Sequence, residues 1–211
     1  PQAQAVLCSS CLAPQPALPC PSCPSLHCSP ACQSADLQHL LECRHRGLSL
    51  QPPTARAVAR LLLRLDQAGL DQGEQLPQGA GLRTFRDLLS HADRLEVDEE
   101  ARGLWGQLKE VLPEEVVGDW PYFLGVYGRF LINSFTVHSS EVAVCRAMDT
   151  EMAVEGQALY LAPCILDHSC APSAQATFQG LRLEVQATEA AASWRDLTIS
   201  YIDTGLARKQ R

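Results

Sequence analysis

The spacing of apolar residues divides the chain into three regions of different character. Residues 1–47 are rich in Pro, Ser and Cys and poor in the aliphatic residues that a packed core requires. Residues 48–132 repeat apolar positions at the three- and four-residue spacing of amphipathic helices. From residue 133 onward the pattern changes to short segments typical of strands. The sequence therefore predicts an α+β protein.

The middle region predicts four helices, whose apolar stripes we assign to helix-on-helix packing rather than to a cofactor site. Capping residues, glycine and proline set the expected bounds. A Gly- and Gln-rich link over residues 69–81 separates the first helix from the second. The helices are expected to begin at Thr54, Thr84, Asp98 and near Pro121, with the first ending at Gly69 and the third at Leu112 before Pro113.

The remaining elements are shorter. Residues 33–43 predict one helix that carries His39 and Cys43 one turn apart on the same face. Residues 174–178 and 181–185 predict two strands joined by a turn at Gln179 and Gly180, because the second segment alternates with a period of two. Further strands are expected at residues 159–161 and 197–202.

Seven cysteines and one histidine form four pairs of potential metal ligands in the first region. Two or three residues separate the members of each pair, so both side chains can reach one metal, and eight ligands suffice for two closed tetrahedral zinc sites. Disulfides are the alternative, but seven cysteines cannot all pair, and the histidine would then have no role. The pairs are Cys8 and Cys11, Cys20 and Cys23, Cys28 and Cys32, and His39 and Cys43.

Net charge and hydropathy argue against nucleic acids and membranes as binding partners. The 211 residues carry a formal net charge of −7, which gives no support to nucleic-acid binding through a basic surface. The end of the cysteine-rich region offers only Arg44 and Arg46 for phosphate contacts, so DNA binding there is also not expected. No apolar run approaches the length of a membrane span, and we expect an intracellular protein without a membrane partner.

Four motifs in order resemble the SET and MYND domain-containing (SMYD) family of protein-lysine methyltransferases. The order and spacing of the eight ligands resemble a MYND zinc finger. Downstream, residues 132–137 (I-N-S-F-T-V), 166–172 (L-D-H-S-C-A-P) and 197–203 (L-T-I-S-Y-I-D) resemble three SET-domain motifs. The resemblance implies a two-zinc MYND finger over residues 1–47, a helical SET insertion over residues 48–132 and the C-terminal part of a β-rich SET domain over residues 133–211.

The resemblance also implies how the zinc ligands divide. In the family the ligand pairs cross, whereas a sequential division would use the same residues and stays open on sequence alone. Closed four-ligand sites leave no position for water, so both ions are expected to be structural. His27 and His45 lie beside ligands and are interpreted as bystanders. The crossed division places Cys8, Cys11, Cys28 and Cys32 on the first ion, and Cys20, Cys23, His39 and Cys43 on the second.

For the SET half, the resemblance implies methyl transfer from S-adenosylmethionine to a lysine amine. Tyr201 would be the catalytic phenol, although an aromatic residue packed on a strand is the plainer alternative. Asn133, Asp167 and His168 would contact the cofactor. The family has asparagine where this chain has Asp167, and the carboxylate lacks the amide donor but can accept a hydrogen bond from the cofactor's ammonium group. We expect cofactor binding to be retained in altered form.

Two expectations concern the whole protein. The family's first cofactor-binding segment precedes its finger, and a cysteine cluster follows its SET core, so we expect this chain to be a fragment with little activity alone. The main hypothesis is a nuclear and cytoplasmic methyltransferase acting on histone tails or other lysine-containing proteins. The alternative is an inactive interaction module, in which the finger recruits proline-containing peptides or transcriptional regulators.

Overall fold

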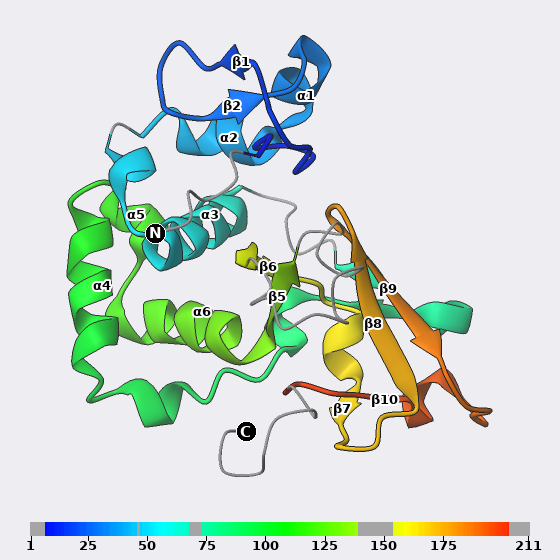
Figure 1. The fold of residues 1–211 in the computed structure, drawn as a ribbon. Coiled ribbons are helices and arrows are strands. Elements are labelled where there is room, and N and C mark those ends of the chain that lie inside the picture. The colour runs from blue at the N-terminus through cyan, green and yellow to red at the C-terminus, as the bar shows by residue number, and fades with distance from the viewer. Residues whose placement is uncertain (1–6, 46, 68–72, 139–153, 203–211) are drawn as a thin grey trace.

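A computed structural model describes residues 7–45, 47–67, 73–138 and 154–202 (Figure 1). Helices and five two-stranded sheets occur together in this part of the chain, which confirms the predicted α+β class. Figure 1 shows the finger at the top, above helix α3 (Pro53–Asp66), with α6 (Trp120–Asn133) below α3 and the hairpin of β8 (Ala174–Gln179) and β9 (Arg182–Ala187) at the right.

The finger consists of a short hairpin and two short helices. Strand β1 (Leu18–Pro19) pairs antiparallel with β2 (Leu26–His27), and helices α1 (Pro30–Ala35) and α2 (Leu37–Glu42) follow. The single helix predicted over residues 33–43 is therefore wrong. Asp36 breaks it with a φ of −79° and a ψ of 76°, and its side chain caps α2 instead.

Four α-helices build the main core: α3 (Pro53–Asp66), α4 (Glu99–Lys109), α5 (Glu114–Val117) and α6 (Trp120–Asn133). The predicted start of α4 after Asp98 is confirmed, because Asp98 accepts hydrogen bonds from the N–H groups of Glu100 and Ala101. The 3-10 helix η1 (Leu48–Leu50) links the finger to α3. The largest fully buried apolar side chains of this core are Phe123, Leu48, Leu62, Leu108, Val58 and Val117.

Two helix predictions need correction, and a third falls on residues that the structure does not describe. Thr54 lies inside α3, because Pro52 takes the capping position and Pro53 starts the helix. The helix expected to begin at Thr84 is only the 3-10 turn η4 (Phe85–Asp87), and Leu89 just beyond it is 68% exposed. The expected end at Gly69 lies outside the described residues.

The link between α3 and α4 also contains short elements that the sequence did not reveal. Strand β3 (Glu74–Gln75) pairs antiparallel with β4 (Leu82–Arg83), and the 3-10 helix η3 (Pro77–Gly79) lies between them. A further 3-10 helix, η5 (Ala92–Leu95), packs against α6.

In the C-terminal region, β5 (Ser134–His138) pairs antiparallel with β6 (Val154–Leu159), and β8 (Ala174–Gln179) with β9 (Arg182–Ala187). The second pair confirms the predicted hairpin, with Gly180 in its turn at a φ of +59°. The strand expected at residues 159–161 is misplaced, because β6 ends where that segment begins.

Two segments far apart in sequence form a short parallel ladder. Strand β7 (Asp167–His168) follows the 3-10 helix η6 (Pro163–Ile165), and β10 (Thr198–Ile199) follows η7 (Trp194–Asp196). The ladder aligns Thr198 with Asp167 and Ile199 with His168. The strand predicted over residues 197–202 is thus only two residues long. No helix in the described ranges has the length and apolarity needed to cross a membrane.

Candidate functional site

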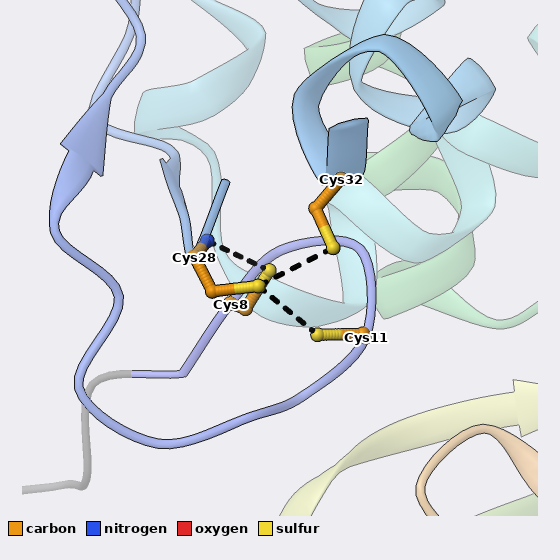
Figure 2. A group of neighbouring side chains, drawn as sticks. All are labelled: Cys8, Cys11, Cys28 and Cys32. Carbon is orange, nitrogen blue, oxygen red and sulfur yellow. Dashed lines mark hydrogen bonds between the residues drawn. The ribbon is translucent and has the colours of Figure 1, made fainter. Parts of the chain in front are cut away.

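The thiol groups of Cys8, Cys11, Cys28 and Cys32 point toward one another, as Figure 2 shows. Cys8 and Cys11 come from the first turn, Cys28 directly follows β2, and Cys32 lies in α1. Their sulfur atoms all lie within 4.8 Å of one another. The Sγ atoms of Cys11 and Cys28 are 3.6 Å apart and those of Cys28 and Cys32 are 3.3 Å apart. Two thiolates on one tetrahedral zinc ion, each about 2.3 Å from the metal, would lie about 3.8 Å apart.

The electrostatics of this group suit a bound dication. Hydrogen bonding to the Cys32 thiol raises the pKa of Cys28 to about 12, since thiolates this close repel one another. Burial disfavours the thiolate of Cys8, but backbone N–H groups outweigh it and lower the pKa of Cys8 to about 6. One of these donors is the N–H of Cys28, 3.3 Å from the Cys8 sulfur. Zinc stabilises coordinated thiolates and would remove the mutual repulsion.

A second group combines three thiols with an imidazole. Cys20 and Cys23 lie on the loop between β1 and β2, His39 lies in α2, and Cys43 caps the end of that helix. The sulfur atoms of Cys20 and Cys43 are 3.7 Å apart, and the Cys23 sulfur lies 3.2 Å from His39 Nε2. Burial lowers the pKa of His39, which favours the neutral imidazole that binds metals.

The two groups correspond to the crossed division of the ligands, not to the sequential one. Thiolate and imidazole donors in sets of four fit tetrahedral zinc, and such closed sets suit a structural ion. The described residues form no disulfide, and their nine cysteines are free. The geometry therefore places all eight predicted ligands in two clusters that could each hold one zinc ion.

A buried carboxylate next to the second group was not predicted from the sequence. Asp36 Oδ2 lies 3.1 Å from His27 Nε2, and Asp36 Oδ1 accepts the backbone N–H of His39 at 2.9 Å. The rings of His27 and His39 meet edge to face at 4.9 Å, and His27 is fully buried. An aspartate three residues before His39, at the start of an apolar segment, is a helix-capping signal that could have revealed this contact.

The C-terminal ladder brings together three of the four residues predicted for methyl transfer. The backbone N–H of Tyr201 donates to His168 Nδ1 at 3.0 Å, and the two rings are 5.4 Å apart. The Tyr201 hydroxyl donates to the carbonyl of Leu166, next to Asp167. Partial burial, together with the nearby Asp167 carboxylate, raises the pKa of Tyr201 above its ordinary value. The phenol is therefore protonated at neutral pH.

Asn133, the fourth predicted residue, lies at the end of α6. Its amide donates to the carbonyls of Leu89 at 3.0 Å and Arg129 at 2.8 Å. The Cys164 thiol lies within hydrogen-bond distance of two backbone carbonyls, that of Tyr160 at 2.9 Å and that of Asn133 at 3.2 Å. Among the described residues, no hydrogen bond joins Asn133 to Asp167 or His168, so its side chain serves the end of the helix in this conformation.

The chain is similar to several curated lysine methyltransferases, whereas no family model matches it. It is 27% identical to histone-lysine N-methyltransferase SMYD3 of Mus musculus over 219 residues, 98% of this chain and 47% of the relative. It is 26% identical to N-lysine methyltransferase SMYD2-B of Danio rerio, covering 85% of this chain and 40% of the relative.

A third relative is SET domain and MYND-type zinc finger protein 6 of Schizosaccharomyces pombe, with 26% identity over 91% of this chain and 36% of the relative. The chain thus spans about half or less of the length of the curated relatives it matches. Agreement among several relatives over most of the chain confirms the resemblance to the SMYD family.

Proposed function

We propose that this chain is the finger, helical insertion and C-terminal SET portion of a SMYD-type protein-lysine N-methyltransferase. The domain bounds would be residues 1–47, 48–132 and 133–211. The relatives are named histone-lysine or N-lysine methyltransferases, which supports the reaction class. Histone tails or other lysine-containing proteins would be the substrates, and the nucleus and cytoplasm the compartments.

The observation that carries this proposal is the hydrogen bond between the Tyr201 backbone and His168 Nδ1. This bond joins the motif of His168 to the motif of Tyr201, 33 residues later in the sequence. Methyl transfer by this family would need both motifs in the same active site. An aromatic residue that merely filled a core would not need its hydroxyl beside a polar edge, and Tyr201 is 60% exposed. In our proposal the protonated hydroxyl orients the lysine amine, which must be neutral to attack.

The cofactor would lie along the same edge. When bound, S-adenosylmethionine supplies an electrophilic methyl group on a sulfonium sulfur. The Asp167 carboxylate is exposed and fits the ammonium group at the methionine end of the cofactor. His168 would hold this segment in place through its contact with Tyr201. Asn133 would join the site after releasing the carbonyls that its amide now contacts.

The two zinc ions would hold the finger together rather than take part in chemistry. The finger has few aliphatic residues, so ligand binding must supply much of its folding free energy. Its partner would be a proline-containing peptide or a transcriptional regulator. The alternative function is an inactive module that keeps this recruiting role. The aspartate at position 167 favours this inactive module. The family motif has an asparagine there, whose amide N–H can donate a hydrogen bond, whereas a carboxylate can only accept one.

Two measurements test the proposal. Calorimetric titration of S-adenosylmethionine into the wild type and Asp167→Asn asks whether the cofactor binds; absence of binding by both would count against the enzyme. Incubation of radiolabelled cofactor and core histones with the chain, and with the same chain inside its longer natural protein, asks whether methyl transfer occurs. Methylation by the longer protein, lost in Tyr201→Phe, is the expected result. Unlabelled histones in all reactions would favour the inactive module.

A further inference from the structure

A cavity of about 700 Å³ lies where the second zinc cluster meets the turn that leads to α3. One wall is the loop of Pro21 and Pro24, which flank the predicted ligand Cys23. The opposite wall is lined by Glu42, Cys43, Arg44, His45, Gly47, Ser49 and Leu50. Its size falls within the range of cavities that bind small ligands and peptide side chains. None of the functions proposed above uses it.

The charged group that the cavity leaves free to bind a partner is positive, although the chain is negatively charged overall. Its only carboxylate, Glu42, is buried and already binds the guanidinium groups of Arg56 and Arg60. Arg44, on the rim, is exposed and has no ion pair among the described residues. The neighbouring His45 adds an imidazole that can donate a hydrogen bond. Arg56 and Arg60 neutralise Glu42 without lining the cavity, so Arg44 is the uncommitted charge among its described lining residues.

The cavity also has an apolar side. Leu50, at the mouth of the cavity, is 79% exposed and offers an uncovered aliphatic surface to a partner. Pro21 and Pro24 face the same space and carry no backbone N–H. Since the adjacent cysteines belong to a candidate metal-ligand cluster, a bound zinc ion would hold this wall in a fixed shape.

We propose that this cavity binds a short acidic segment of a partner protein. A bulky aliphatic side chain of the partner lies against Pro21, Pro24 and Leu50, and a neighbouring carboxylate pairs with Arg44. A nucleic acid fits less well, because a single uncommitted arginine among the described lining residues is too few for a phosphate backbone. The inference does not depend on methyltransferase activity, since binding can be measured whether or not the chain transfers methyl groups.

The experiment uses fluorescence anisotropy of the full 211-residue chain, loaded with zinc, and a fluorescein-labelled peptide with Glu-Leu-Glu between Gly-Ser flanks. We expect saturable binding. Arg44→Glu should weaken it by about tenfold or more, as loss of one charged contact plus repulsion predicts, and Leu50→Ser by about fivefold. Arg94→Glu is the matched control, because Arg94 is also exposed but does not line the cavity, and it should change binding less than about twofold.

Peptides with Lys-Leu-Lys or Glu-Ala-Glu at the centre should bind more weakly than Glu-Leu-Glu. Equal binding of the lysine peptide, or equal effects of Arg44→Glu and Arg94→Glu, would overturn the proposal. So would absence of Glu-Leu-Glu binding, Arg44-dependent binding of a 20-nucleotide RNA in its place, or self-association through Leu50 in sedimentation. Zinc content and thermal unfolding of each variant verify its fold, and Arg44→Gln replaces Arg44→Glu if the charge reversal unfolds the chain.

Discussion

The carboxylate of Glu42, at the end of finger helix α2, accepts two hydrogen bonds from the guanidinium group of Arg60 on α3. Arg56, one turn earlier on α3, donates to the other carboxylate oxygen at 2.5 Å. Glu42 immediately precedes the predicted zinc ligand Cys43. The finger and the helical region are therefore joined by a buried ionic contact, not only by the chain between them.

Replacing this carboxylate should destabilise the contact strongly. Glu42→Gln leaves two guanidinium groups, each about one third exposed, without their counter-charge. We expect a loss of about 2–3 kcal/mol in the free energy of unfolding, below the full cost of a completely buried pair because the arginines remain partly solvated. Urea denaturation measures it. Glu115→Gln, at an exposed position without an ion pair in the described residues, should have little effect, and equal losses in both variants would contradict the interpretation.

Pairs of ligand substitutions distinguish the crossed zinc arrangement from the sequential one. Cys11→Ser combined with Cys28→Ser damages only the first cluster of the crossed arrangement, so about one zinc per chain should remain. Cys11→Ser combined with Cys20→Ser damages both clusters, and zinc should be lost entirely. Metal analysis of purified protein gives the stoichiometry. The sequential arrangement predicts the reverse, with one ion kept in the second double variant and none in the first.

Asp36 should strengthen zinc binding without touching the metal. It caps α2 through the His39 N–H and holds His27 beside the His39 ring. Asp36→Ala should reduce the zinc affinity of the second cluster by about 10- to 100-fold, as loss of such outer contacts does elsewhere. Competition with a fluorescent zinc chelator measures this. Asp36→Asn keeps an oxygen for the cap and should lose less, and an unchanged affinity in Asp36→Ala would refute the role.

Gly128 permits a close contact between α6 and the chain before η5. A Cβ atom at this position would lie 2.1 Å from the carbonyl oxygen of Ser90, and backbone on both sides leaves little room to move. Gly128→Ala should lower the free energy of unfolding by about 2 kcal/mol through overpacking. Gly106→Ala on α4 meets no atom within 4 Å and should stabilise the chain by about 0.5–1 kcal/mol. Thermal unfolding compares the two, and a tolerated Gly128→Ala would show that α6 can shift.

The titration of Tyr201 depends on Asp167. Partial burial and the Asp167 carboxylate both favour the neutral phenol, so the pKa of Tyr201 is raised in the folded chain. The resulting stabilisation is complete below the ordinary pKa of tyrosine and is lost as the pH rises through the raised value. Asp167→Asn should lower the pKa toward the ordinary value while the effect of burial remains. Carbon NMR of labelled tyrosine, assigned with Tyr201→Phe, measures it; an unchanged pKa would place Asp167 too far away to matter.

Sequence patterns correctly predicted the elements that are formed by residues close to one another in the sequence. The hairpin of β8 and β9 follows from strict alternation about Gly180, and α4 from its apolar stripe behind Asp98. The two clusters of candidate metal ligands were also evident, since pair spacing is a property of the sequence. The break at Asp36 was missed because one residue both ends α1 and caps α2. The hydrogen bond from the His39 N–H to the Asp36 side chain replaces hydrogen bonds that one continuous helix would have made.

Contacts between distant segments could not be read in the same way. The sequence motifs suggested that His168 and Tyr201 meet, but not that a parallel ladder of two residues on each side would join them. Nor did any pattern pair Glu42 with Arg56 and Arg60, because charged residues on a helix are usually solvated. Such contacts depend on how whole elements pack, which apolar periodicity constrains only loosely.

The anchor at residue 201 is made by the main chain, while the proposed chemistry belongs to the side chain. The backbone N–H of residue 201 would still donate a hydrogen bond to His168 Nδ1 if phenylalanine replaced Tyr201. Architecture and reactivity at this position are therefore separable by one oxygen atom. A relative of this protein can therefore lose catalytic activity by one substitution and still keep the fold. A protein that only recruits partners can arise from an enzyme in this way without any change of structure.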